Sequence, residues 1–553
     1  MNRTKKILAI WLSLALLLGL LSACAGAQEE TADETELSDT VSGQTLTAGE
    51  AEDNVFSLAA DFSKTLNPIT TTSSLNQMVG DLVYDRLFDV DGNFNVTSRI
   101  LEDWYYSKSE GSSGYWVLTV RDGILMHDGE PLTAADVAYS LSRVFSSGAR
   151  HYMAQMSRIY VSNYQGQVYI AGDYDNGLLP QRLAVPIIRS APDEILKSTP
   201  IGSGPYKFSE DGKTLEKFDD YEFADDLPVE TIYLRQYDGP EELIHEYESA
   251  LVDLVVNDPT NIYNMGYGGK SEKRIIYTGN LHFICYNTNS TFFRYEAYRN
   301  AMTYIIDRET ICDSVLDGAA DPATIPIHPN SALYNAEFAD SYAYNPQRCK
   351  DELEKGGCRD LDGDGMLEFA LSGNKVDILI NFVVCADNAA KVQEARRIAD
   401  DMEAIGLTVN LRELNWKDYI AALEFDPDDE DLDEEDMPTW TWDMYYGEIG
   451  LTGDCNTLTL FTGDWYDDGT LNYGRWDLPL LESSVRDYLG AVEEARPDAE
   501  LTMLQTLMQN SPFTAVCFER REAISHVGVI TGMVPNQYNV FYDFAKWNVN
   551  LNG

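Results

Sequence analysis

An acidic loop has the side chains and the spacing needed to bind a cation. Asp360, Asp362 and Asp364 occupy alternate positions and Gly365 follows them, which is how an EF-hand calcium loop begins. The bidentate glutamate that such a loop needs at its twelfth position is absent, because Leu371 stands there. We therefore interpret the segment as a polar turn and predict no bound metal, with a weak calcium site as the alternative.

The residue types that carry most enzymatic chemistry occur without the spacing that catalysis requires. The sequence has no nucleophile elbow, no His-Glu-x-x-His zinc motif, no phosphate-binding P-loop and no dinucleotide fingerprint. The six histidines show no metal-ligand spacing and lie at positions 127, 151, 245, 282, 328 and 526. His127 and Asp128 precede an expected helix, where turn chemistry is an ordinary use of these side chains. We expect neither catalysis nor a cofactor.

The amino terminus predicts export and a lipid anchor. A basic region is followed by an apolar run from Ile7 to Leu21 that is too short to span a bilayer, which is the pattern of a signal peptide. Leu21-Ser22-Ala23-Cys24 resembles the lipobox of bacterial lipoproteins, whose cysteine receives a diacylglyceryl group. Two acyl chains hold a protein on a membrane where one binds only marginally. We expect residues 1–24 to be the signal peptide, with Cys24 lipidated at the outer face of the bacterial cytoplasmic membrane.

Charge and composition restrict the partners and the organisation of the chain. The formal net charge is −51 at pH 7, which makes nucleic acid and anionic membrane surfaces poor partners. Residues 25–53 are rich in acidic and small polar residues and have almost no aliphatic ones, so we expect a disordered tether there. The roughly 500 residues that follow exceed what one hydrophobic core usually supports, which predicts two or more lobes.

Local patterns place one strand and one helix in the first third of the chain. Alternation of apolar and polar residues from Tyr115 to Val120 predicts a strand that stops at the turn pair Asp122-Gly123. Thr133 is the expected cap of the next helix, with Asp136 three residues on in a near capping box.

A second pattern predicts a parallel sheet. It consists of a strand over residues 376–382, a helix over residues 389–405 that Gly406 ends, and a strand from Leu407 to Arg412. A strand, helix and strand of this length form a right-handed βαβ unit. The fold class is therefore predicted to be α/β.

The segment between the first predicted strand and helix resembles a signature of one family. Residues 121–141, RDGILMHDGEPLTAADVAYSL, resemble the core motif of the family 5 extracellular solute-binding proteins, the oligopeptide, dipeptide and nickel receptors of ABC importers. Five further segments resemble this family in the same order along the chain: residues 66–68, 82–88, 201–206, 285–289 and 298–308. The resemblance covers nearly the whole chain after the tether.

The resemblance implies a two-lobed, periplasmic-binding-protein-like fold of type II, with an extra subdomain and a hinge between the lobes. The first lobe would comprise residues 54–88, 200–277 and 498–553, with an inserted subdomain at residues 89–199. The second lobe would comprise residues 278–497. Closure of the lobes on a ligand is the expected transition, driven by contacts that exist only in the closed state.

The resemblance also implies a set of ligand-binding residues. In peptide-binding members an aromatic and acidic segment of the second lobe faces the cleft, and an aspartate there pairs with the α-ammonium group of the ligand. The matching residues are Trp440, Trp442, Tyr445, Tyr446 and Asp454, together with Asn287 from the motif at residues 285–289. The usual Gly-Asp-Pro reads Gly453-Asp454-Cys455 here, without the proline. Core packing is the alternative role of the aromatic side chains.

Cysteine usage adds one open question. Seven cysteines besides Cys24 contain no CxxC pair, so neither a zinc ribbon nor a thioredoxin motif is present, and isolated buried thiols are expected. The resemblance places Cys285 and Cys455 in neighbouring segments, which leaves a bridge between them as the alternative.

The function implied by the resemblance is that of a lipoprotein receptor. It would bind a small peptide in the cleft between the lobes, as a monomer, and deliver it to the permease and ATPase of an ABC importer. A non-peptide ligand, such as an oligosaccharide, chelated nickel or haem, is one alternative. A ligand-sensing receptor without transport is another.

Overall fold

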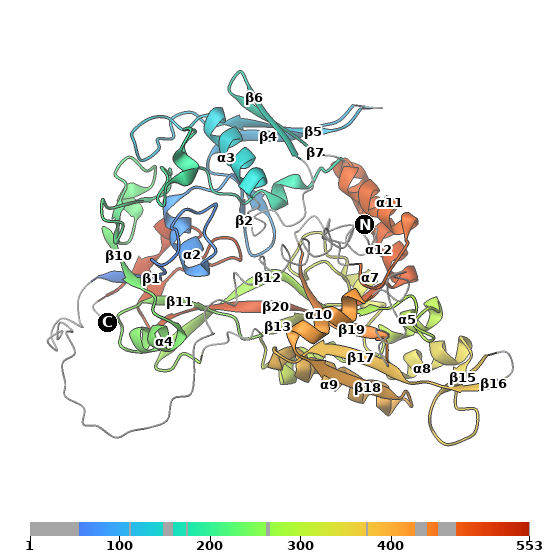
Figure 1. Ribbon diagram of the computed structural model, residues 1–553. Coiled ribbons are helices and arrows are strands. Elements are labelled where there is room, and N and C mark those ends of the chain that lie inside the picture. The colour runs from blue at the N-terminus through green and yellow to red at the C-terminus, as the bar shows by residue number, and fades with distance from the viewer. Residues whose placement is uncertain are drawn as a thin grey trace, which may run out of the picture.

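Two long antiparallel strands, β12 (Ser271–Tyr286) and β20 (Phe513–His526), run through the middle of the molecule (Figure 1). Along β12, Ile276 belongs to one hydrophobic core and Leu281 to another. The two halves of the molecule are therefore joined through these strands. The computed structural model describes residues 55–109, 112–147, 159–172, 175–260, 266–371, 374–425, 440–451 and 472–551.

The first half contains two four-stranded sheets, with strand orders β1-β10-β9-β8 and β4-β5-β7-β6. One hydrophobic cluster includes residues of both sheets, so the two share a core. The strands are β1 (Phe56–Ala60), β4 (Leu101–Ser107), β5 (Tyr115–Val120), β6 (Ile159–Tyr164), β7 (Gln167–Gly172), β8 (Tyr206–Phe208), β9 (Thr214–Lys217) and β10 (Thr231–Gln236). The helices and short strand pairs around them are α2 (Ser74–Val83), α3 (Ala134–Ser147), α4 (Pro240–Glu248), β2 (Asp89–Val90) with β3 (Val96–Thr97), and β21 (Ile530–Thr531) with β22 (Asn548–Val549).

The predicted strand and capped helix of this half are confirmed. Strand β5 has the predicted bounds, and α3 begins directly after Thr133. The Asp136 carboxylate accepts hydrogen bonds from the backbone N–H of Thr133 at 2.8 Å and from its hydroxyl at 2.6 Å. The carboxylate of this near capping box therefore satisfies the backbone donor at the start of the helix.

A seven-stranded sheet continues from the first half into the second. Its order is β11-β20-β12-β19-β17-β18, and β13 pairs with β20 beside this path. Strand β17 is parallel to both of its neighbours, and the other pairs are antiparallel. The further strands are β11 (Leu254–Asn257), β13 (Ala320–Pro322), β17 (Ile380–Cys385), β18 (Val409–Leu414) and β19 (Met444–Gly450).

The predicted βαβ unit is confirmed as β17, α9 (Ala389–Ala404) and β18, with Gly406 at φ +99° just after the helix. The bounds of its first strand were wrong. Residues 374–377 form β16 of a separate three-stranded sheet, and β17 begins only at Ile380. The alternating pattern continues while the chain passes from one sheet to the next, so periodicity does not mark the boundary.

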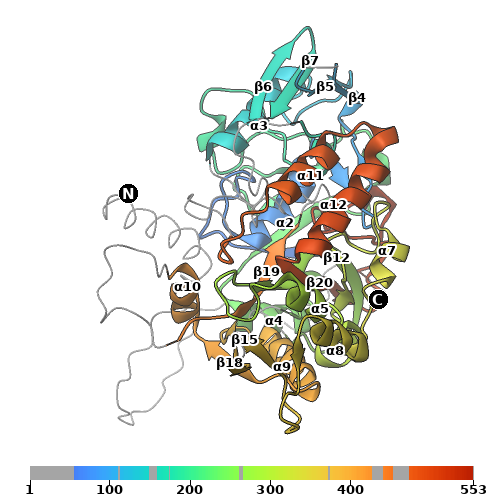
Figure 2. The same ribbon diagram turned by 90° about the vertical axis from the view of Figure 1, so that its right-hand side faces the viewer.

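The second half buries both faces of the large sheet. Alternate residues of β12, β17 and β19 point into two separate clusters. One face is covered by α5 (Glu296–Met302), α8 (Pro346–Lys355) and α9, and the other by α10 (Trp416–Glu424), α11 (Pro479–Gly490) and α12 (Arg496–Asn510). Figure 2 shows α11 and α12 side by side. The remaining elements are α6 (Arg308–Thr310), α7 (Ala336–Asp340), β14 (Cys358–Arg359), β15 (Glu368–Leu371) and β16 (Asn374–Asp377).

Within the described ranges, no helix is both long and apolar enough to cross a bilayer. The predicted signal peptide with Cys24, and the predicted tether at residues 25–53, lie outside these ranges.

His127 and Asp128 take structural roles, as the sequence predicts. The half-buried imidazole of His127 donates from Nε2 to the carbonyl of Gly204 at 3.0 Å. Asp128 forms an ion pair with Arg189 at 2.6 Å. Burial lowers the pKa of His127 to about 4.

His127 should make the protein less stable in mild acid. Because the pKa in the folded protein lies below the unfolded value of about 6.5, the unfolded chain alone binds this proton between those pH values. Stability therefore falls as the pH drops from about 6.5 to about 4, by about 2 kcal/mol after allowance for partial exposure of the ring. Chemical denaturation across this pH range should show a smaller decrease in the free energy of unfolding for His127→Gln than for the wild type. The exposed His245→Gln is the matched control, and an unchanged fall in His127→Gln would contradict this role.

Candidate functional site

The predicted aromatic residues divide between the two faces of the large sheet. On β19, Tyr445 pairs with Cys285 and Tyr446 with Ile284 of β12, so neighbouring side chains point to opposite faces. Tyr445 packs edge-on against Trp442 at 5.4 Å between ring centroids, and Tyr446 lies in the cluster beneath α9. Both tyrosines are buried.

Trp440, Trp442 and Asn287 lie just beyond the paired ends of β19 and β12. Trp440 is partly buried, and the guanidinium of Arg412 stands 4.1 Å from its ring centroid. Trp442 is buried, and its carbonyl accepts a hydrogen bond from the side-chain amide of Asn287 at 2.9 Å. These contacts are structural, and ligand binding by the same residues stays a prediction. Asp454 and Cys455 lie outside the described residues, and Cys285 carries a free, buried thiol.

The acidic loop forms a turn that is paired with a lysine of strand β16. The two oxygens of Asp360 accept hydrogen bonds from the N–H groups of Gly363 and Gly365, at 2.6 and 3.0 Å. The ammonium group of Lys375 lies 2.7 Å from Asp362 and 3.0 Å from Glu368. These contacts support the interpretation as a polar turn.

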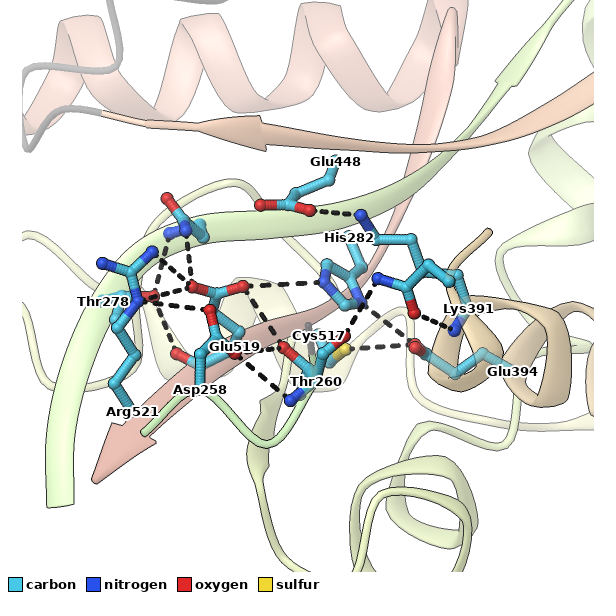
Figure 3. A network of polar contacts seen from close by, with 12 residues as sticks. Asp258, Thr260, Thr278, His282, Lys391, Glu394, Glu448, Cys517, Glu519 and Arg521 are labelled. Carbon is cyan, nitrogen blue, oxygen red and sulfur yellow. Dashed lines mark hydrogen bonds and ion pairs between the residues drawn. The ribbon is translucent and has the colours of Figure 1, made fainter. Parts of the chain in front are cut away.

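A buried network of charged side chains stands where β12 and β20 pass from the first core to the second (Figure 3). The sequence patterns did not single it out. Its members share the sheet face beneath α9 or border it, and those labelled in the figure are Asp258, Thr260, Thr278, His282, Lys391, Glu394, Glu448, Cys517, Glu519 and Arg521. The sequence feature that could have indicated the network is the presence of charged residues inside runs that otherwise predict buried strands.

His282 is the centre of this network. In the strand register it stands opposite Glu448 of β19 on one side and Cys517 of β20 on the other. Its Nδ1 lies 3.1 Å from Oε2 of Glu394, which comes from α9 and also accepts a hydrogen bond from the hydroxyl of Tyr446. Its Nε2 has no hydrogen-bond partner among the described residues and lies 4.0 Å from Oε2 of Glu519. The His282 side chain is fully buried.

Two cations balance part of the negative charge. Lys391 pairs with Oε2 of Glu448. Arg521 pairs with Oε1 of Glu519 at 3.0 Å and with Asp258 at 3.4 Å. Burial and the negative charge of Glu448 raise the pKa of Glu519. Burial lowers the pKa of His282, but the charge and hydrogen bond of Glu394 together with the charge of Glu448 raise it, and the net shift is upward.

A bulge in β12 adjoins the network. The pairing with β20 changes register between Tyr277 and Leu281, and the Thr278 hydroxyl donates to the carbonyl of Glu519 at 2.7 Å within this irregularity. Gly279 lies so close to β19 that a Cβ at this position would stand 2.1 Å from the carbonyl oxygen of Leu451. Only glycine permits this approach.

The chain is similar to known proteins over its whole length. Residues 95–456 match the model of the bacterial extracellular solute-binding proteins, family 5 middle. The oligopeptide-binding protein AppA of Bacillus subtilis (strain 168) is 25% identical over 99% of this chain and 99% of its own. The nickel-binding periplasmic protein of Escherichia coli (strain K12) is 23% identical over 63% of this chain and 68% of its own. The solved structure of Bacillus subtilis AppA with a nonapeptide has the same fold, with a TM-score of 0.55, 20% identity, and coverage of 90% of this chain and 98% of that one.

Gly279→Ala should destabilise the protein by about 1–3 kcal/mol, because the new methyl group must push β19 away from the bulge. Denaturant unfolding measures this loss. Gly92→Ala is the matched control, since its Cβ would meet only Tyr277 at 3.9 Å, which is an ordinary contact. Equal stability of the two variants would show that the approach of β19 at Gly279 is not tight.

Proposed function

The chain belongs to the bacterial extracellular solute-binding proteins of family 5, and on that basis we propose that it binds a peptide between two lobes and delivers it to an ABC importer. Proteins of this family are substrate receptors that work outside the cell or in the periplasm. The observation that carries the proposal is the alignment with an oligopeptide-binding protein over nearly the full length of both chains.

The proposed lobes are residues 54–88, 200–277 and 498–553 for the first, with residues 89–199 inserted, and residues 278–497 for the second. The two cores joined by β12 and β20 support this division. Helix α12 packs in the cluster of the second half, which favours a boundary within β20 over one at residue 498.

The proposed receptor is a monomer that carries a diacylglyceryl group on Cys24 and stays at the outer face of the cytoplasmic membrane. The lipobox sequence supports this anchor. Mass spectrometry of the mature amino-terminal peptide tests it, since an unmodified Cys24 is incompatible with it.

The proposed ligand contacts come from the aromatic segment and Asp454. Among the described members of that segment, Trp440 has part of its surface exposed, and Arg412 stacks on it. Aromatic surfaces bury the apolar parts of varied ligands, and a carboxylate suits the cationic end of a peptide.

Native mass spectrometry of protein purified without denaturation should reveal bound peptides of varied mass. The bound peptide is removed and then restored. Small-angle scattering should show a smaller radius of gyration once the peptide is restored, because the lobes close on it. The recovered peptides should be chemically intact. A single sugar, haem or metal complex in place of peptides, or cleaved peptides, would contradict the proposal.

Asp454→Asn should weaken the binding of a peptide with a free α-amine by about 2–5 kcal/mol, the range for truncating one partner of a buried charge pair. Acetylating that amine should weaken binding to the wild type by a similar amount and to the variant much less, because both changes remove the same interaction. Calorimetry measures the four affinities. Asp477→Asn, at an exposed position, is the control. Equal losses on acetylation in wild type and variant would exclude Asp454 as the amine partner.

A further inference from the structure

The buried network around His282 has the organisation of a metal site. The ligand atoms that His282, Glu448 and Glu519 offer all lie within 4.8 Å of one another. These residues come from β12, β19 and β20, three adjacent strands of one sheet. We propose that they bind one divalent transition-metal ion, with zinc as the expected occupant. None of these three residues is a proposed peptide contact, although Tyr446 of the aromatic segment donates a hydrogen bond to Glu394 beside the site.

The orientation of His282 supports this assignment. Its Nδ1–H is committed to the Glu394 carboxylate at 3.1 Å, so in the neutral ring the lone pair is on Nε2. Nε2 is buried, has no hydrogen-bond partner in the part of the chain that the structure describes, and faces Glu519. Metal-binding histidines typically donate their second ring nitrogen to a carboxylate in this way, which fixes the ring and raises its basicity.

Each glutamate keeps one oxygen for a metal. Lys391 contacts Oε2 of Glu448, and Asn280 and Arg521 contact Oε1 of Glu519. Among the described residues, Oε2 of Glu519 makes one hydrogen bond, at 3.3 Å with the hydroxyl of Thr260, and it lies 4.0 Å from Nε2 of His282. Each carboxylate therefore has one oxygen that is not held by a cation.

The charge balance also fits a divalent ion. With His282 neutral, the four carboxylates of the network face two cations, Lys391 and Arg521. Two negative charges remain at a largely buried place, where uncompensated charge is costly. The carboxylates are Asp258, Glu394, Glu448 and Glu519.

The distances require only a small rearrangement. Ligand atoms around tetrahedral zinc lie about 3.3 Å apart, because each is about 2.0–2.2 Å from the metal. A contraction of at most about 1.5 Å would bring the three groups into this shell. One imidazole and two carboxylates with a fourth position for water are a usual zinc donor set. Glu448 is 26% exposed, which gives the ion a path from solvent.

The test uses the full chain, stripped with a chelator and dialysed against Zn²⁺ in the presence of excess Mg²⁺. Magnesium occupies sites made only of oxygen ligands, which a chain with a net charge of −51 offers in number. Metal analysis should give one zinc per wild-type chain. His282→Gln, Glu448→Gln and Glu519→Gln should each weaken zinc binding about 100-fold or more. The matched control is Glu522→Gln, because Glu522 lies on β20, as Glu519 does, but pairs with Lys273 outside the proposed site. Its zinc affinity should equal that of the wild type.

Three further measurements separate ligands from neighbours, and the first does not depend on the folding of a variant. X-ray absorption of the zinc-loaded wild type should show one imidazole and otherwise oxygen, without sulfur. Glu394→Gln should weaken binding about 10- to 100-fold while leaving this spectrum unchanged, because Glu394 only orients the ring. Cys517→Ser should bind zinc as the wild type does. A zinc–sulfur signal, retention of zinc by folded Glu519→Gln, or no zinc bound by the wild type would overturn the proposal.

Discussion

The pairing of β12 with β20 is the constraint on which the rest of the structure depends. Both strands pass from one hydrophobic core into another, so each half of the molecule is completed by the same two segments. Because main-chain hydrogen bonds fix the register, a side chain on one strand has a defined neighbour on the other. Each of these strands must therefore contain residues that pack in two different hydrophobic cores.

The junction between the cores is the place where regular pairing stops. The bulge around Gly279 adjoins a polar cluster, and the buried charges of that cluster need partners from the surrounding elements. Helix α9 supplies Lys391 and Glu394, and β19 supplies Glu448. The network therefore connects the βαβ unit that contains α9, and also β19, to the junction of β12 and β20.

The sequence predicts the elements well where a local rule applies. The alternation over residues 115–120, the box formed by Thr133 and Asp136, and the stop at Gly406 each depend on neighbours within a few positions, and all three are confirmed. The β16–β17 boundary failed because the pattern is the same on both sides of a change of sheet. The network around His282 was missed because its partners lie far apart along the chain, 259 positions in the pair of Thr260 with Glu519.

The energies of the network limit where the two halves can move relative to each other. Breaking a buried charge pair costs about 3–5 kcal/mol, whereas a ligand typically couples to a conformational change with about 1–3 kcal/mol. A closure that separated Glu519 from Arg521 would therefore cost more than a ligand supplies. The network must move as one body with the second half of the molecule. Bending is then expected outside the network, because Thr278 and Asn280, in the irregular stretch of β12, are themselves hydrogen-bonded to Glu519.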